Sequence, residues 1–259
     1  PNGTPQGRGD MTAVASDTLS YLRGRHSFKF GGEYRRFYNN NFAQTVGSFG
    51  FASISDFLNG QANLFTATLG NQSSSIIQQA LGSFAQDSFK LKPNFTLELG
   101  LRYDWLMSPS ERYNRLVVFD PATNSLNRVG AGIDEIYQDN HAVQPRVGVA
   151  WDPFKDGKTS IRAAYAILAD QPVTNLITGA AANPPLADPR SFSPPASNPG
   201  LRTTFGNALI AAAAVGLAPA SVDNNFDDAY VQSWNLNVQH EVTPSLGVMI
   251  GYFGSKGTH

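Results

Sequence analysis

The 259-residue sequence contains no cysteine, which excludes a disulfide framework, thiolate zinc sites and thiol catalysis. Charged residues are scarce, at 15% of the chain, whereas soluble domains usually contain about a quarter. With 19 basic and 20 acidic residues the net charge is −1, so no global field attracts nucleic acid. The longest apolar run, residues 208–218, falls short of the roughly 20 residues that a membrane-spanning helix needs.

Motifs of common enzyme chemistries are also missing. The chain has four histidines, His26, His141, His240 and His259. None has the HExxH spacing of a zinc site, and no GxSxG nucleophile motif occurs. The stretch GKTS at 157–160 ends like a phosphate-binding loop, but Asp152 stands where the first glycine is required. We therefore expect no catalytic, cofactor-binding or metal-binding residues and predict that the protein is not an enzyme.

The chain is rich instead in alternating segments, of which residues 95–105 are the clearest. The odd positions are apolar or aromatic: Phe95, Leu97, Leu99, Leu101, Tyr103 and Trp105. The even positions are small or polar: Thr96, Glu98, Gly100, Arg102 and Asp104. This period of two predicts a strand with one apolar face and one polar face.

Similar alternation predicts eight strands in all, with a break in phase near Phe37. They cover about 12–22, 26–38, 76–90, 95–105, 143–151, 160–168, 233–241 and 246–253. Short links rich in turn residues, at 23–25, 91–94, 152–158 and 242–245, suit antiparallel neighbours. They alternate with long connections at about 39–75, 107–142 and 169–228. One end of the sheet should therefore have tight turns and the other end large loops.

This combination is typical of an antiparallel transmembrane β-barrel, which has short periplasmic turns, long extracellular loops and aromatic girdles. We predict an all-β fold in which residues 1–259 form about eight strands of one larger outer-membrane barrel. The predicted polar, lumen-facing residues are Lys29, Glu33, Arg35, Glu98, Arg102, Asp104, Arg146 and Arg162. The predicted lipid-facing and girdle residues are Phe95, Leu97, Leu99, Leu101, Tyr103, Trp105, Trp151, Trp234 and Tyr252. The alternative is a soluble sheet, in which the inward charges form a solvated face.

The long connections contain several candidate features. Residues 207–219 read as a short helix that Asn207 caps and that Gly216 and Pro219 end, either a lid over the barrel or packing among loops. Residues 53–60 read as one or two helical turns. A possible ligand surface consists of Phe42, Phe49, Phe51, Phe57 and Phe65. A weakly supported Ca²⁺ site, with a solvated loop end as its alternative, consists of Asp223, Asp227 and Asp228.

Four segments resemble, in the same order, consecutive barrel segments of TonB-dependent outer-membrane receptors: GRHSFKFGGEYR, SFAQDSFKLKPNFTLELGLRYDW, QPRVGVAWDPFKDGKTSIRAAYA and YVQSWNLNVQHEVTPSLGVMIGYFGSKGTH. They are most similar to the Oar-like subgroup, whose members carry a carboxypeptidase-regulatory-like domain. The resemblance implies energised uptake through a barrel of about 22 strands with a plugged lumen. It also implies outer-membrane lipid, the plug, the TonB complex and an unknown extracellular ligand as partners. The chain would then be a piece of a longer receptor.

Two other functions stay open at this stage. The first is a passive channel or surface adhesin built on a similar barrel without TonB coupling. The second is a soluble secreted β protein, such as a carbohydrate-binding or hydrolytic domain. A plug and TonB box elsewhere in the protein would argue against the first, and recovery of the protein in the membrane fraction would argue against the second.

The predicted faces can be tested by one pair of substitutions. Leu99→Arg places a charge on the predicted lipid face, where it costs about 2–4 kcal/mol near the bilayer midplane. Glu98→Gln changes only the predicted lumen face and should be nearly silent. Membrane insertion of the two variants, measured by heat-dependent gel mobility, should differ accordingly, and equal effects would contradict the assigned faces.

Overall fold

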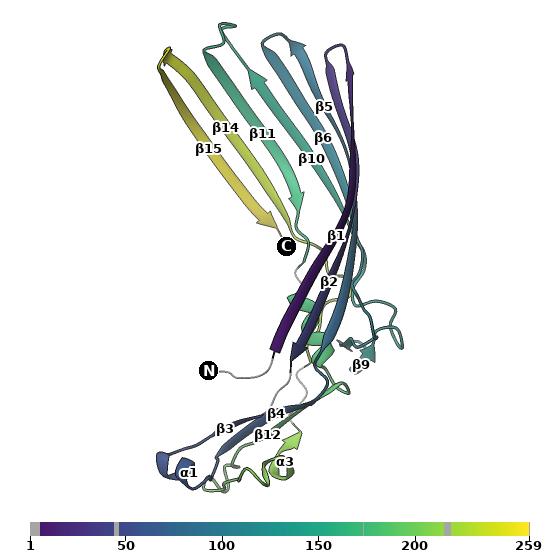
Figure 1. The fold of residues 1–259 in the computed structure, drawn as a ribbon, viewed down its shortest axis with the longest axis vertical. Coiled ribbons are helices and arrows are strands. Elements are labelled where there is room, and N and C mark those ends of the chain that lie inside the picture. Colours follow the sequence, from purple (N-terminus) through teal and green to yellow (C-terminus); the bar gives the residue numbers. More distant parts are fainter. Residues whose placement is uncertain (1–5, 44–46, 173, 215–218, 259) are drawn as a thin grey trace.

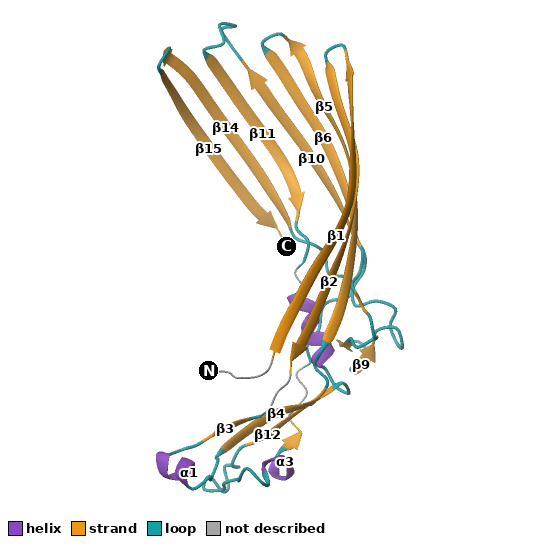
Figure 2. Ribbon diagram, viewed as in Figure 1, coloured by secondary structure: helices purple, strands orange, loops and turns teal. Residues whose placement is uncertain are grey.

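The computed structural model describes residues 6–43, 47–172, 174–214 and 219–258. Its main element is one large antiparallel sheet, shown in Figures 1 and 2. Eight long strands follow one another in the order β1-β2-β5-β6-β10-β11-β14-β15, so every neighbour along the sheet is also the next long strand along the chain. Their bounds are β1 Gln6–Arg23, β2 His26–Ala43, β5 Ser74–Lys92, β6 Phe95–Leu106, β10 Asn140–Trp151, β11 Thr159–Ala169, β14 Tyr230–Thr243 and β15 Leu246–Thr258.

The links between these strands separate by length, as the sequence predicts. Two-residue links join β1 to β2, β5 to β6 and β14 to β15, and residues 152–158 join β10 to β11. The first of these turns contains Gly24 with a φ of +60°, a conformation that glycine adopts without steric cost. Figure 1 shows the four short links at one end of the sheet and the long connections at the other. We call these the turn end and the loop end.

The strand register decides which side chains share a face, because residues directly opposite in neighbouring strands point the same way. Leu99 lies opposite Asp87 and Val147, and Glu98 lies opposite Ser88 and Gly148. Followed across all the pairings, the register places one set on what we call the charged face: Lys29, Glu33, Arg35, Glu98, Arg102, Asp104, Arg146 and Arg162. It places the other set on what we call the apolar face: Phe95, Leu97, Leu99, Leu101, Tyr103, Trp105, Trp151, Trp234 and Tyr252.

The apolar face exposes large side chains over most of the sheet. Leu99 is 49% exposed, Val143 58% and Tyr252 63%, values far above those of a soluble protein's core. A contiguous exposed apolar surface of this kind marks contact with a partner or a lipid phase. Two acids, Asp17 and Asp87, interrupt it, and the Asp87 carboxylate lies 2.6 Å from Nδ1 of His26 near the turn end.

Aromatic side chains on the apolar face near the loop end have polar partners. The hydroxyl of Tyr34 donates to Oε1 of Gln79 at 2.5 Å, and Nε1 of Trp105 donates to Asp139 at 2.7 Å. The hydroxyl of Tyr103 lies 2.7 Å from Nδ1 of His141. Such rings, apolar along the body and polar at the tip, suit a boundary between hydrocarbon and water.

The three long connections contain their own short elements. The first holds β3 Ser48–Gly50, α1 Ile54–Leu58 and β4 Leu64–Gly70. The second holds β7 Ser110–Glu111, β8 Val117–Asp120 and β9 Ser125–Arg128. The third holds α2 Asn175–Thr178, the 3₁₀ helix η1 Gly179–Ala182, β12 Ala187–Phe192, α3 Ala208–Ala211 and β13 Ala213–Ala214. We refer to them as loops 1, 2 and 3.

Loops 1 and 3 share a second, four-stranded sheet in the order β13-β12-β4-β3. Phe65 of β4 lies opposite Phe192 of β12, although 127 positions separate them in the chain. A small core holds this loop sheet together, made of Phe65, Ala67, Phe192, Ala208 and Ala212 with Phe49 packed against it. Figure 1 shows the loop sheet beyond the loop end, carrying α1 and α3.

The expected loop helices are found, but one is shorter than predicted. α1 begins after Ser53, whose hydroxyl accepts a hydrogen bond from the Asp56 N–H at 3.0 Å, so the helical reading of 53–60 is correct. α3 covers only Ala208–Ala211, and Asn207 makes no side-chain cap. Its Oδ1 accepts from Thr203 and Thr204 instead. The predicted end at Gly216 lies outside the described residues.

A second correction concerns β2, where the predicted break in phase near Phe37 does not occur. The register of β2 with β1 and with β5 runs without a shift past this position. Phe37 is therefore an aromatic residue on the charged face, where the Arg35 guanidinium lies 5.9 Å from its ring centroid. Within the described parts of the chain, no helix is long and apolar enough to cross a membrane.

Candidate functional site

A polar network crosses the charged face near the loop end and links four strands. Arg102 of β6 donates from Nε and Nη2 to the two oxygens of Asp104, at 2.8 and 2.7 Å. The same Nη2 lies 3.4 Å from Glu33 of β2. Gln144 of β10 donates to Asp104 and accepts from the backbone N–H of Ala169 in β11 at 3.1 Å. Since Asp104 and Gln144 are buried, each polar atom needs the partner it has.

Gly82 of β5 makes room for this network. It lies opposite both Glu33 and Asp104, between the strands that supply the charges. A Cβ at this position would overlap Nη2 of Arg102 and Oδ1 of Asp104. The missing side chain therefore lets the Arg102–Asp104 pair reach across β5 toward β2.

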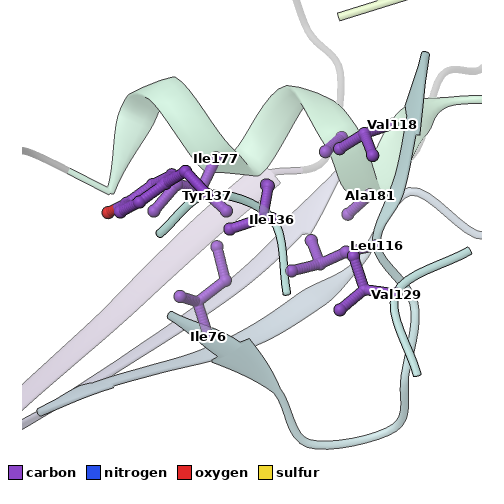
Figure 3. Close-up of a cluster of buried hydrophobic side chains, with 9 residues drawn as sticks. Ile76, Leu116, Val118, Val129, Ile136, Tyr137, Ile177 and Ala181 are labelled. Atoms are coloured by element: carbon purple, nitrogen blue, oxygen red, sulfur yellow. The ribbon is translucent and has the colours of Figure 1, made fainter. Parts of the chain in front are cut away.

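Loops 2 and 3 fold onto the charged face of the sheet at its loop end. Figure 3 shows a buried cluster in which Ile76 of β5 meets side chains from both loops. The cluster consists of Ile76, Leu116, Val118, Val129, Ile136, Tyr137, Ile177, Ala180 and Ala181. Ile76 shares the face of Gln78, Ala80 and Gly82 by strand alternation. The loops thus cover the charged face at its loop end, whereas the apolar face stays exposed.

Two buried polar side chains tie these loops together and to the wall. Asn183 in loop 3 donates to the carbonyls of Val117 and Ala220, at 2.5 and 2.7 Å, and accepts from the Ala220 N–H at 2.9 Å. The Glu111 carboxylate in loop 2 accepts from the backbone N–H of Ser75 in β5 at 2.8 Å and from two N–H groups of its own loop. Loss of either side chain would leave buried N–H and C=O groups without a hydrogen-bond partner, which is costly. These contacts therefore fix the loop conformation.

A cavity of about 530 Å³ lies between the loop ends of β1 and β2 and the helix η1. It is lined by Gln6, Gly7, Arg8, Asn41, Phe42, Gln72, Ser74, Thr178, Gly179 and Ala182. Arg8 reaches from the wall to loop 3, donating from Nη2 to the Thr174 hydroxyl at 3.1 Å. The size and mixed lining fit a small-molecule site.

The predicted aromatic surface of loop 1 is divided between core and solvent. Phe65 is buried in the loop sheet, and Phe49 packs on it with ring centroids 4.7 Å apart. Phe57 is 60% exposed and packs edge-on against Phe51. Phe205 of loop 3, which the sequence reasoning missed, joins this group 4.6 Å from Phe49.

The acidic stretch at the end of loop 3 contains one unusual carboxylate. Burial, helped by the charges of Asp170 and Asp227, raises the pKa of Asp228 to about 6. Burial and the charge of Asp228 also raise the pKa of Tyr137. In the parts of the chain that the structure describes, no three His, Cys, Asp or Glu side chains gather closely enough to hold a metal ion.

The stretch GKTS lies in the link from β10 to β11 and leads into a strand. The Asp152 carboxylate accepts from the backbone N–H groups of Lys155 and Gly157, both at 2.9 Å, and closes the turn. A phosphate-binding loop would instead lead into a helix whose N-terminus faces the anion. The hairpin reading of this stretch is correct.

A family model described as "Outer membrane beta barrel domain" matches residues 1–259. The chain belongs to the outer membrane β-barrel domain family. Its long antiparallel sheet is thus the wall of a barrel in the outer membrane, of which the chain forms a part. None of the curated proteins matches it.

Several solved structures are similar to the chain. The unliganded ferric citrate transporter FecA is 10% identical, with a TM-score of 0.45, over 98% of this chain and 28% of FecA. The siderophore receptor PiuA from Acinetobacter baumannii is 14% identical, with a TM-score of 0.46, over 95% of this chain and 32% of PiuA. The toluene transporter TbuX from Ralstonia pickettii is 10% identical, with a TM-score of 0.32, over 97% of this chain and 57% of TbuX. The chain spans about a third or less of the first two.

Gln144, Gly82 and Asn183 hold the site together, and the sequence reasoning assigned none of them to it. Nothing local distinguishes Gly82 and Asn183 from other glycines and asparagines. Their roles follow from which strand or loop lies opposite. A scan for polar residues in the charged-face phase would have found Gln144, whose phase matches that of Arg146.

The role of Gly82 can be tested with a matched glycine. Gly82→Ala should displace the Arg102–Asp104 pair and lower the free energy of unfolding by about 1–3 kcal/mol, the usual cost of a disrupted buried polar contact. Gly100→Ala in β6 is the control, because its added Cβ would meet Arg146 Cβ at an ordinary 3.7 Å. Urea unfolding of the full-length barrel in detergent measures both, and equal losses would contradict this role for Gly82.

The raised pKa of Asp228 predicts a pH dependence of stability. An acid with an unfolded-state pKa of 3.8 and a folded-state pKa of about 6 binds more protons when folded between those values. The stability of the folded state should therefore decrease as pH rises from about 4 to 6. Thermal unfolding of the full-length protein at pH 4, 5, 6 and 7 should show this decrease.

The Asp228→Asn variant should lose this contribution while keeping the rest of the pH profile. Asp223→Asn is the matched control, since Asp223 is an exposed acid of the same stretch and accepts from the Asn225 N–H at 2.9 Å. A wild-type profile that Asp228→Asn leaves unchanged would show that Asp228 titrates normally.

Proposed function

We propose that this chain forms part of the wall and extracellular loops of an outer-membrane receptor that imports a ligand with TonB-derived energy. In this proposal the apolar face contacts lipid and the charged face lines the lumen. The loop end faces the outside, so loops 1 to 3 make the first contact with the ligand. The protein performs no covalent chemistry.

The fold of loops 2 and 3 is the observation that carries the proposal. Their shared cluster packs on Ile76 of the charged face, so they reach inward over the proposed lumen and do not extend away from the wall. A passive channel needs an open lumen, whereas a receptor that captures and then imports its ligand is closed from outside at rest. The cavity of about 530 Å³ beside η1 gives such a receptor a place for ligand at the level of the loops.

Exposed charges in the turn-end half of the charged face suit the proposed plug. Lys29, Glu98, Arg146 and Arg162 are all exposed and lie beyond the reach of the loop cluster. Both signs of charge occur among them, so a polar plug domain could pair with each. In the Oar-like receptors that the sequence resembles, this plug and the TonB box provide the energy coupling.

Uptake by intact cells tests the proposal. Cells that carry the full-length receptor are grown in complex medium beside cells that lack its gene and cells that lack TonB. Mass spectrometry of the spent medium should find at least one compound that wild-type cells deplete and both mutants leave. Depletion that needs the receptor gene but not TonB would identify a passive channel, and equal depletion by all three strains would remove the import function.

A further inference from the structure

Two arginines lie at the turn end of the apolar face without an acidic partner. Arg23, the last residue of β1, lies opposite His26, so the register places it on the apolar face. Arg25 lies in the link from β1 to β2, and its guanidinium lies 5.6 Å from the ring centroid of Phe89 on the same face. Both arginines are exposed, and none of the ion pairs among the described residues includes either of them.

The two acids of the apolar face do not neutralise these arginines. Oδ2 of Asp87 lies 2.6 Å from Nδ1 of His26, which is its partner. Asp17 lies six positions before Arg23 in β1, about 20 Å away along an extended strand. A charged side chain on a lipid-facing surface needs a counter-ion or water, because hydrocarbon provides neither. Since short turns lie on the periplasmic side of an outer-membrane barrel, phospholipid phosphates are the anions that meet this end of the wall.

Arg25 is held in place and still has donors for a ligand. Its Nη1 donates to the carbonyl of Leu91 at 2.9 Å, and its guanidinium lies over the ring of Phe89. A guanidinium has five N–H donors, and the bond to Leu91 uses one of them. The remaining donors can bind two oxygens of one phosphate group, the geometry for which arginine is better suited than lysine.

A row of stacked rings leads from Arg25 along the apolar face. The rings of Phe89 and His26 stack with centroids 4.2 Å apart, and those of His26 and Phe28 with centroids 5.3 Å apart. The ring of Phe30 follows, 6.0 Å from that of Phe28. Because Phe30 lies further from the turn end than His26, this row connects the arginine with the part of the wall nearer the bilayer centre.

A groove of about 530 Å³ begins at these phenylalanines and crosses the apolar face. Ala85 lies opposite both Phe30 and Leu101, and its small side chain leaves space between them. The volume lies within the range of about 300–1,000 Å³ that is usual for ligand pockets. The apolar side chains that line the groove include Phe28, Phe30, Ala85, Leu99, Leu101 and Val147.

We propose that the turn end of the apolar face binds a phospholipid of the periplasmic leaflet. Its phosphate lies on Arg23 and Arg25, and one acyl chain lies in the groove beside Ala85. The arginines complement a phosphate and the groove complements a hydrocarbon chain, so the two together select a molecule that has both parts. The inference rests on the proposed assignment of the apolar face to lipid, and it does not depend on TonB coupling.

Lipid titration of the purified full-length protein in detergent tests this inference, with native mass spectrometry as the readout. Dioleoyl phosphatidylglycerol carries the phosphate, and dioleoylglycerol has the same chains without it. The first phosphatidylglycerol should bind about ten-fold more tightly than dioleoylglycerol, the change expected from charge-assisted hydrogen bonds to the phosphate. Equal affinity for the two lipids would overturn the inference, whereas the uptake proposal would stand because it requires no particular lipid.

Two basic residues of the turn end locate the phosphate. Arg25→Gln should weaken phosphatidylglycerol binding about ten-fold. Lys90→Gln is the matched control and should bind as the wild type does, because Lys90 is exposed at the same end but lies opposite Thr96 on the charged face. Heat-dependent gel mobility checks that both variants are folded, and the comparison of the two lipids on the wild type decides the matter if Arg25→Gln does not fold. Unchanged affinity in folded Arg25→Gln would contradict the phosphate site.

A second pair of variants locates the acyl chain. Ala85→Phe fills the groove and should weaken phosphatidylglycerol binding several-fold. Ala15→Phe is the control, because Ala15 is an exposed alanine of the apolar face on β1 that does not line the groove. Equal affinities of the two folded variants would show that the chain does not lie in the groove.

Competition distinguishes a lipid from a free phosphate ester. Glycerophosphoglycerol is the soluble headgroup of phosphatidylglycerol without its chains, and it is added to the protein with one phosphatidylglycerol bound. At the same concentration as the lipid it should leave the lipid in place, because it cannot occupy the groove. Complete displacement would identify a site for soluble phosphate esters and would overturn the assignment to a phospholipid.

Discussion

Backbone pairing is the constraint on which the rest of this structure depends. A sheet that crosses a membrane must satisfy each N–H and C=O through its neighbours, because hydrocarbon offers no partner. Antiparallel pairing of consecutive strands does so with the shortest possible links, which explains the four tight turns. Pairing also fixes the faces, since a shift of one residue would exchange Leu99 with Glu98. Where the pairing between β10 and β11 ends, the Gln144 side chain accepts the hydrogen bond from the Ala169 N–H in place of a backbone carbonyl.

The sequence predicts the wall well because its signals are local. Alternation over ten residues and turn residues at the strand ends identify all eight long strands and the end at which each link lies. The loop sheet had no such signal, since four wall strands, β5, β6, β10 and β11, separate Phe65 from Phe192 along the chain. The shortened α3 has a similar cause. Asn207 accepts hydrogen bonds from Thr203 and Thr204 and does not cap the helix, and Ala213 then pairs with β12.

The candidate site could be predicted only in part for the same reason. Phase alone groups Glu33, Arg102 and Asp104, although it does not reveal that Arg102 and Asp104 form a two-point pair. That pair needs the space left by Gly82 of β5. It also depends on Gln144 of β10, which bonds both Asp104 and the Ala169 N–H of β11. Asp228 was visible as an acid near other acids. Its missing partner and the nearby Tyr137 depend on how loops 2 and 3 pack.

The two loop cores differ in a way that bears on ligand capture. The cluster around Leu116 and Ile177 includes Ile76 of the wall. Moving this cluster away from the wall would expose apolar surface and break the hydrogen bonds of Asn183 and Glu111. The core of the loop sheet contains loop residues alone. The packing of this core therefore includes no residue of the wall. In the proposed receptor the inner cluster is therefore held against the wall, whereas the loop sheet is held by its own core.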